Sequence, residues 1–434
     1  GTATIFDYDN GWIENVRQIV NGIEQKFNFI YDDGGRRERL KYFNGASLVT
    51  QTTYGFDNAS RLLEMKHLNS LSQILEQVNY TYDLNGNKSS MNRPSVNLPM
   101  ANPASNTSYN EANQMLSFND KNITYDNNGN MTSVTNTCGT TNYTWDVRNR
   151  LTGINGYKPD CSLLTASFKY DALGRRIEKT INGRTIKYLY DGLDIVQEIE
   201  GGAVSANYVR TLNIDEPLAR VKADGTVRYY QTDALGSVIA LTDEAGAVKT
   251  QYSYDPFGDV TVSGEASDNP FQFAGRENDN TGHLFERNRY YSYELMRYIS
   301  EDPIGFAGGD VNFYVRLGNN PVNFTDPLGL WRWHGNWGGP NWTGGQKGTW
   351  SSVDRSKVKP PIDRQDACYK AHDICYGGCR DKKSCKSKDH AACFKDCDRG
   401  LSACLLFLGN DPSNNWKAKA AATYFGNSDP RADK

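Results

Sequence analysis

The stretch "KYDALGR", residues 169 to 175, decides the fold of this chain because its pattern keeps returning. In each copy an aromatic residue is followed by Asp and then, in most copies, by a turn that contains Gly or Asn. Further copies of the pattern lie at Tyr8, Tyr31, Phe56, Tyr82, Tyr125, Trp145, Tyr190 and Tyr254. Most neighbouring copies are 20 to 26 residues apart, a period typical of arrays in which each unit buries its apolar face against the next.

Each copy predicts a β-hairpin. Residues of alternating polarity lead into the aromatic residue, and Asp-x-x-Gly makes the turn because Gly and Asn readily adopt positive φ. Stacked hairpins give a long twisted sheet. The composition agrees, since 26 Tyr and 40 Gly against 6 Met favour strands and turns over a helical bundle. We therefore expect a mainly β protein.

The last quarter of the chain has a different chemistry. Residues 331–434 carry 18 Lys and Arg against 11 Asp and no Glu, a net charge of +7, which leaves −10 for residues 1–330. Seven of the nine cysteines and six of the eight tryptophans also lie there. No stretch approaches the roughly 20 apolar residues that span a bilayer. The sequence thus predicts two modules, neither of which crosses a membrane.

Two Asp-Pro motifs lie near the boundary between these modules. "DPIGF" and "DPLGL" place Asp302 and Asp326 24 residues apart. Asp-Pro often does no more than start a turn. A carboxylic acid and a carboxylate held together can also share the acid and base roles on a peptide bond.

These features resemble YD-repeat proteins of the Rhs type, and the sequence of residues 275–330 resembles their repeat-associated core. The resemblance implies that residues 1–270 form part of a hollow β shell, that 271–330 form the core, and that 331–434 hold a variable toxin. It further implies self-cleavage between Leu330 and Trp331 by Asp302 and Asp326. The chain is expected to begin inside a longer protein, because its first residues already look like the repeats.

The tail predicts two antiparallel helices with facing cysteines. "DACYKAHDICYGGC" (366–379) belongs to the first helix and "KDHAACFKDCDRGLSACLLFLG" (388–409) to the second. Facing residues of such helices have a constant sum of positions, and three cysteine pairs share the sum 772. The predicted disulfides are Cys368–Cys404, Cys375–Cys397 and Cys379–Cys393. Cys385 stays unpaired.

His372 and Asp398 also face each other in this arrangement, as a general base and its orienting partner would. A core histidine satisfied by a nearby acid is the alternative. The surrounding motif is similar to that of secretory phospholipase A2. This resemblance implies that Asp398 and Tyr376 orient His372, while Asp373 and the carbonyls of three residues bind Ca²⁺. Those three residues are Trp337, Gly339 and Asn341.

The resemblance further implies hydrolysis of the sn-2 ester of glycerophospholipids. Membrane phospholipids, an immunity protein and a secretion-apparatus spike or adaptor are the expected partners, with no nucleic acid, either as a monomer or assembled with the rest of the shell. The cysteines favour an oxidising destination, so the protein is expected to be secreted and delivered into a target cell, in the periplasm or outside the cell. Action at a membrane surface is expected from the basic charge and the tryptophans of the tail. One family disulfide is missing, since Tyr369 and Gly338 stand where its cysteines would be.

Two other functions stay open. A metal-dependent nuclease tail would also suit the basic charge, and "CYGGC" could bind zinc. Alternatively, the chain is an adhesive or structural shell with a disulfide-stapled cap.

Overall fold

The computed structural model describes residues 3–9, 12–20, 22–84, 86–308 and 310–330, together with 342–343 and 346–347. The chain divides into two compact units, Gly1–Trp331 and Arg332–Lys434. The four described residues of the second unit form one short ladder, β29 (Trp342–Thr343) with β30 (Gln346–Lys347).

Residues of the first repeats form an antiparallel sheet of eight strands in which sequence neighbours are also sheet neighbours. The strands are β1 (Thr4–Asp9), β2 (Trp12–Val20), β3 (Ile23–Tyr31), β4 (Arg37–Asn44), β5 (Ser47–Phe56), β6 (Leu62–Asn69), β7 (Ile74–Tyr82) and β8 (Lys88–Asn92). This arrangement is the stack of hairpins that the sequence predicts.

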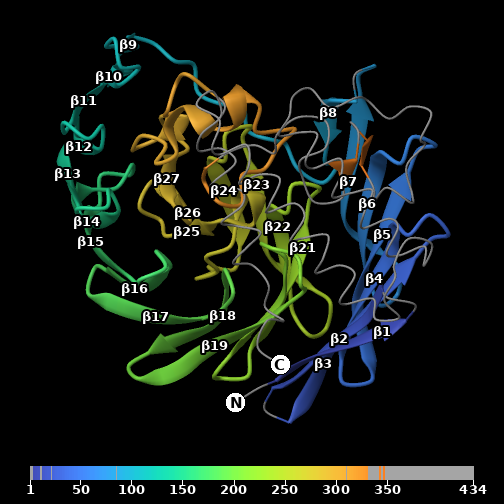
Figure 1. Cartoon of the computed structure of the whole chain (residues 1–434). Coiled ribbons are helices and arrows are strands. Elements are labelled where there is room, and N and C mark those ends of the chain that lie inside the picture. The colour runs from blue at the N-terminus through green and yellow to red at the C-terminus, as the bar shows by residue number, and fades with distance from the viewer. Residues whose placement is uncertain are drawn as a thin grey trace, which may run out of the picture. The chain divides into compact units, whose positions relative to one another are not determined.

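A second sheet of sixteen strands continues the same meander (Figure 1). Its strands are β9 (Ser108–Tyr109), β10 (Met115–Phe118), β11 (Lys121–Tyr125), β12 (Met131–Asn136), β13 (Gly139–Trp145), β14 (Leu151–Tyr157), β15 (Leu163–Tyr170), β16 (Arg176–Ile181), β17 (Arg184–Asp191), β18 (Asp194–Glu200), β19 (Ala203–Arg210), β20 (Pro217–Lys222), β21 (Val227–Thr232), β22 (Val238–Thr242), β23 (Val248–Tyr254) and β24 (Val260–Gly264). We call this sheet the wall.

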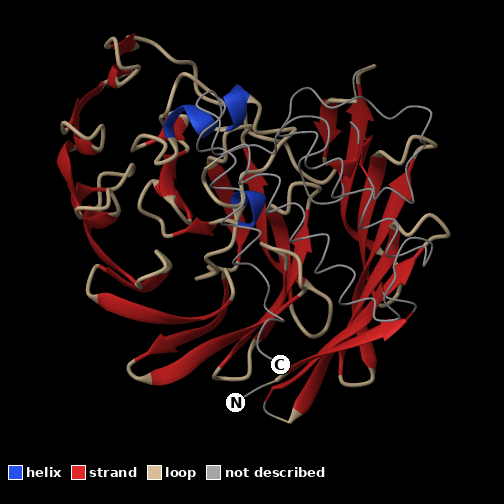
Figure 2. Ribbon diagram, in the orientation of Figure 1, coloured by secondary structure: helices blue, strands red, loops and turns tan. Residues whose placement is uncertain are grey.

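A four-stranded sheet follows, made of β25 (Glu277–Asn278), β26 (His283–Glu286), β27 (Arg289–Ser292) and β28 (Arg297–Tyr298). The helical turns of the described residues are three short 3-10 segments, η1 (Phe273–Gly275), η2 (Gly305–Gly308) and η3 (Leu317–Asn319). Strands dominate the ribbon throughout (Figure 2). The prediction of a mainly β protein is confirmed, whereas the predicted tail helices lie outside the described residues. No helix among the described residues is long and apolar enough to span a membrane.

The repeat owes its regularity to one turn. In the copy at Asp171, Oδ1 accepts hydrogen bonds from the N–H groups of Leu173 and Arg175, both at 2.9 Å, and Oδ2 accepts one from Arg175 Nε at 2.7 Å. Gly174 takes φ +87° between them. The Arg175 guanidinium then stacks 5.2 Å from the ring centroid of Tyr190 in the next copy. This turn therefore stabilises its own backbone and also contacts the next copy.

The hydrophobic core is formed by every second side chain of these strands, on the face that is buried. Phe27 and Val16 of the eight-stranded sheet pack in one cluster with Val209 and Tyr229 of the wall. The wall's Phe168 packs with Phe285 and Tyr290 of the four-stranded sheet in another cluster, and the Phe168 and Tyr290 ring centroids lie 5.4 Å apart. The four-stranded sheet is thereby fixed against the wall.

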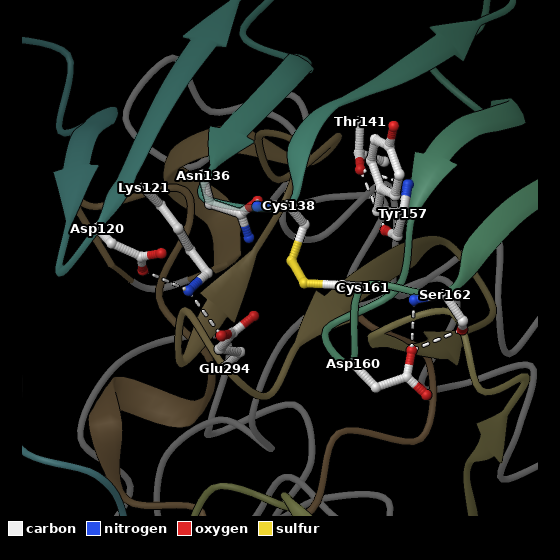
Figure 3. The surroundings of a disulfide bond; sticks show 10 residues. All are labelled: Asp120, Lys121, Asn136, Cys138, Thr141, Tyr157, Asp160, Cys161, Ser162 and Glu294. Atoms are coloured by element: carbon white, nitrogen blue, oxygen red, sulfur yellow. Dashed lines mark hydrogen bonds and ion pairs between the residues drawn. A yellow bond between two sulfur atoms is a disulfide. The ribbon is translucent and has the colours of Figure 1, made fainter.

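Cys138 and Cys161 form a disulfide within the wall (Figure 3), a pairing that the sequence leaves undecided. They lie in the turns after β12 and β14, with a Cα–Cα distance of 5.2 Å. The β13–β14 pairing ends at Asn142 and Asn155, short of these turns. Beyond that point, Thr141 Oγ1 hydrogen-bonds to the backbone N–H (2.9 Å) and carbonyl oxygen (3.1 Å) of Tyr157. The disulfide thus links the two turns beyond the last backbone pair between β13 and β14.

Candidate self-cleavage site

Asp302 and Asp326 use the turn of the repeats. Asp302 Oδ1 accepts a hydrogen bond from the N–H of Ile304 at 3.0 Å, and Asp326 Oδ1 accepts one from the N–H of Leu330 at 3.1 Å. Four residues after the Asp, where the copy at Asp171 has an arginine, the sequence has Phe306 and Leu330. In neither turn, therefore, does an arginine four residues later bind Oδ2 of the aspartate, as Arg175 does for Asp171.

One arginine from another element takes that place for both carboxyl groups. Arg289, the first residue of β27, has Nη2 3.0 Å from Asp302 Oδ2 and 3.7 Å from Asp326 Oδ2. Its guanidinium is buried and lies 3.6 Å from the centroid of the Tyr298 ring. Two aspartates that are 24 residues apart in sequence therefore meet around a single positive charge.

Tyr298 links this pair to a third carboxylate. Its hydroxyl lies 2.5 Å from Glu286 Oε2 and 3.1 Å from Asp326 Oδ2. A phenol has one proton to donate, so the hydroxyl can donate to only one of these two carboxylates at a time. Glu286 is neutralised by Arg316, whose Nη2 lies 2.8 Å from Oε1.

The two aspartates hold their protons more tightly than ordinary carboxyl groups. Burial raises the pKa of Asp302 to about 6, with Arg289 opposing and the charge of Asp326 adding to the shift. Burial also raises the pKa of Asp326, again opposed by Arg289. In the repeats, by contrast, the pKa of Asp57 is lowered, because hydrogen bonds from Arg61 outweigh burial. A protonated acid beside a carboxylate is the arrangement that acid–base chemistry on a peptide bond requires.

The Leu330 carbonyl oxygen and Asp302 Oδ2 border the same glycine. A Cβ atom built on Gly308 would lie 2.5 Å from Asp302 Oδ2 and 3.1 Å from the Leu330 carbonyl oxygen. The absence of a side chain at Gly308 therefore leaves space beside both oxygens. The structure brings three of the predicted residues together, Asp302, Asp326 and Leu330.

Three consecutive residues hold the segment that leads to Leu330. Arg287 Nη1 donates to the Pro327 carbonyl oxygen, Asn288 Nδ2 donates to that of Leu328 at 3.0 Å, and Arg289 Nε donates to that of Gly329 at 2.5 Å. We call residues 287–289 the clamp. Sequence reasoning missed the clamp, including Arg289, because its three donors lie 40 residues before their acceptors in the chain.

The remaining predicted site residues lie outside the described residues. They are Trp331, the catalytic candidates His372, Asp398 and Tyr376, the calcium candidates Asp373, Trp337, Gly339 and Asn341, and the cysteines Cys368, Cys375, Cys379, Cys393, Cys397 and Cys404. Calcium binding and the tail disulfides stay predictions.

A meander of aromatic-Asp hairpins that ends in a paired-aspartate core defines a YD-repeat protein. The family model of the teneurin YD-shell matches residues 4–322, which is more than half of the chain, so the chain belongs to the teneurin YD-shell family.

Several bacterial proteins are similar in sequence. The tRNA3(Ser)-specific nuclease WapA of Bacillus spizizenii is 32% identical over 76% of this chain and 15% of its own length. The double-stranded DNA deaminase toxin A of Burkholderia cenocepacia is 30% identical over 65% of this chain and 21% of its own. This chain thus corresponds to about a fifth or less of these relatives.

The fold is also similar to a solved structure. The crystal structure of TcdB2-TccC3-Cdc42 superposes with a TM-score of 0.56 at 19% identity, over 76% of this chain and 20% of that one. At this identity the similarity concerns the fold.

Two predictions are wrong. The calcium-dependent phospholipase A2 activity is overturned because several relatives are named nucleases or a DNA deaminase toxin and none of these is named a phospholipase. The predicted partners, membrane phospholipids and no nucleic acid, are overturned by the same names. The physical reason is that a histidine oriented by a carboxylate serves as a general base on many substrates, so the motif alone does not select an ester.

Proposed function

We propose that this chain works within a YD-repeat toxin. Residues up to Leu330 form shell and self-cleaving core, and residues 331–434 are released as a segment that acts on nucleic acid inside a target cell. The observation that carries the proposal is that Asp302 and Asp326 share Arg289, and that Asp302 Oδ2 and the Leu330 carbonyl oxygen border the same glycine.

The cleavage is a hydrolysis in which each aspartate has one role. Asp326, as the carboxylate, takes a proton from water as the water oxygen bonds to the Leu330 carbonyl carbon. Asp302, as the acid, gives its proton to the leaving amide nitrogen of Trp331 while the C–N bond breaks. The products are a carboxylic acid at Leu330 and an amine at Trp331, and the proton has changed places between the two aspartates. Arg289 keeps the charged form of either aspartate tolerable in a buried site.

The test compares each aspartate of the pair with one of the repeats. Asp302→Asn and Asp326→Asn are expected to leave the chain intact, since neither amide can exchange the proton. Asp57→Asn is the matched control, because Asp57 forms the same kind of turn between β5 and β6, outside residues 271–330. Mass spectrometry of the purified chains reads the outcome. An Asp302→Asn chain that still yields a fragment beginning at Trp331 would overturn the proposed role.

Action on nucleic acid is supported by the names of the relatives and by charge. Residues 331–434 carry a net +7, which favours binding to a phosphate backbone. Both hydrolysis of RNA or DNA and deamination of a base fit this proposal.

Gel electrophoresis and base-composition analysis of tRNA and of double-stranded DNA, incubated with the cleaved chain, distinguish the two reactions. His372→Ala tests the predicted general base in the same assay. Unchanged tRNA and DNA, with a demonstrably folded protein, would contradict the proposal.

A further inference from the structure

Arg287 does more than hold one carbonyl of the clamp. Besides the Pro327 carbonyl oxygen, its guanidinium contacts Asp194 Oδ1 at 3.0 Å and Asp215 Oδ1 at 2.8 Å. Asp194 is the first residue of β18, and Asp215 lies between β19 and β20. One side chain therefore joins the wall directly to the segment that precedes the cleavage site.

Arg287 lies in the tight turn between β26 and β27. Glu286 pairs with Arg289, so Arg287 and Asn288 form a two-residue hairpin turn. Arg287 takes φ +54°, the left-handed conformation that the first position of such a turn requires. The turn therefore fixes the backbone from which the Arg287 side chain reaches the two aspartates and the Pro327 carbonyl.

Both aspartates are in turn fixed within the first unit. Asp194 also pairs with Arg210 at 3.3 Å, and Asp215 also pairs with Arg276. Arg210 belongs to β19, so Asp194 stands in place only when the hairpin of β18 and β19 has formed. The hydrogen bond from Arg287 to the Pro327 carbonyl oxygen therefore depends on wall strands that lie about a hundred residues earlier in the chain.

We propose that Arg287 is a positioning residue that makes self-cleavage conditional on a completed wall. The inference rests on the proposed self-cleavage and adds its regulation. With Asp194 and Asp215 in place, the clamp fixes residues 327–329 and so sets the next carbonyl, that of Leu330, against Asp302. Without them the segment is free to move, and a displacement of about 1 Å is enough to slow such a reaction by orders of magnitude. Cleavage is thereby withheld until the shell can hold what it releases.

The experiment follows self-cleavage of the full chain during cell-free synthesis. Arg287→Ala is expected to cleave at least about tenfold more slowly than the wild type. Asp194→Asn combined with Asp215→Asn is expected to do the same. Arg220→Ala is the matched control, because Arg220 is a buried wall arginine paired with Glu198 and Asp268 and belongs to neither the clamp nor its acidic partners. It is expected to cleave within about twofold of the wild type.

Two readouts separate positioning from loss of folding. Low concentrations of guanidinium ion are expected to restore part of the rate of Arg287→Ala, whereas the same ion only destabilises a misfolded chain. The pH at which the rate is half-maximal is expected to stay that of the wild type, because Arg287 does not contact either catalytic aspartate. Arg287→Lys, which keeps the charge, is expected to cleave at an intermediate rate.

The inference is overturned if Arg287→Ala cleaves at the wild-type rate, or if Arg220→Ala slows cleavage as much without rescue in either variant. A wild-type chain that is never cleaved after Leu330 would overturn the proposed function itself, and the inference with it. Asp302→Asn, measured in parallel, tells these failures apart.

Discussion

Asp57 and Asp302 sit in the same kind of turn but differ in the residue four positions later. Arg61 binds Oδ2 of Asp57 at 2.7 Å and keeps it ionised, so this turn is purely structural. Phe306 cannot do so for Asp302, whose Oδ2 instead contacts Arg289 and borders Gly308 together with the Leu330 carbonyl oxygen. The carboxyl group of Asp302 is therefore not held by an arginine of its own turn.

The protonation of Asp302 gives the cleavage a defined pH dependence. Burial raises the pKa of Asp302 to about 6, and the acid role requires the protonated form. Above pH 6 that form declines about tenfold per unit, so the cleavage rate is expected to fall with the same slope. Rates measured from about pH 5 to pH 8 check this. A rate that goes on rising with pH above pH 6 would assign the acid role to another group.

Gly308 is expected to be required for cleavage. A methyl group there would lie 2.5 Å from Asp302 Oδ2 and would push the carboxyl group away from the Leu330 carbonyl. Gly308→Ala should therefore slow cleavage by about tenfold or more while the chain stays folded. Gly55→Ala is the control, since its Cβ would meet nothing closer than 3.6 Å. Equal cleavage of the two variants would show that Asp302 does not need this position.

At the scale of elements, an arginine in four of the turns (Arg36, Arg61, Arg150 and Arg175) ties one hairpin to the next. Arg61 pairs with Asp57 and stacks 5.1 Å from the Tyr82 ring centroid of the following copy. Because Arg61 is about one-third exposed and water screens its charge, Arg61→Ala should lower the free energy of unfolding by only about 1 kcal/mol. Chemical denaturation measures this, with Arg148→Ala, an exposed arginine of another turn, as the control. Equal losses in both variants would refute the role of the stack.

The Cys138–Cys161 disulfide is expected to protect the end of two hairpins. Reduction, or Cys138→Ser with Cys161→Ser, should lower the free energy of unfolding by about 3 kcal/mol. It should also speed amide hydrogen exchange at residues 139–141 and 156–157, where the β13–β14 ladder has ended. Exchange that stays unchanged there would mean that Thr141 alone holds the two strands. A reductant should leave hydrogen exchange at these residues unchanged in the double variant.

The hairpin array could be predicted because its signal is local. Tyr170, Asp171 and Arg175 lie in one short motif, and the contacts that form the turn join residues at most four positions apart. The pair Asp302 and Asp326 could be predicted from the repeated Asp-Pro motif. Arg289 could not, because its value as a partner depends on how β27 packs, which no local pattern specifies.

At the scale of the whole first unit, the contacts that could not be predicted from the sequence are those between segments that lie far apart in the chain. Glu76 and Arg93 form a fully buried ion pair with a distance of 3.1 Å. Arg93 Nη1 also donates a hydrogen bond to the carbonyl oxygen of Tyr252 in the wall at 2.6 Å. Arg287 likewise meets Asp194 from 93 positions away. Such pairs are buried charges that persist only with their partners, so they mark where separate stretches of repeats must come together.

Hydrolysis after Leu330 is the claim on which the rest depends. Cell-free synthesis of the chain in water enriched in ¹⁸O, followed by mass spectrometry of the shell fragment, tests it most directly. The expected result is a fragment that ends at Leu330 and carries one ¹⁸O atom in its new carboxyl group, absent when Asp302 is replaced by Asn. A chain that remains whole, or a fragment that ends at another residue, would contradict it.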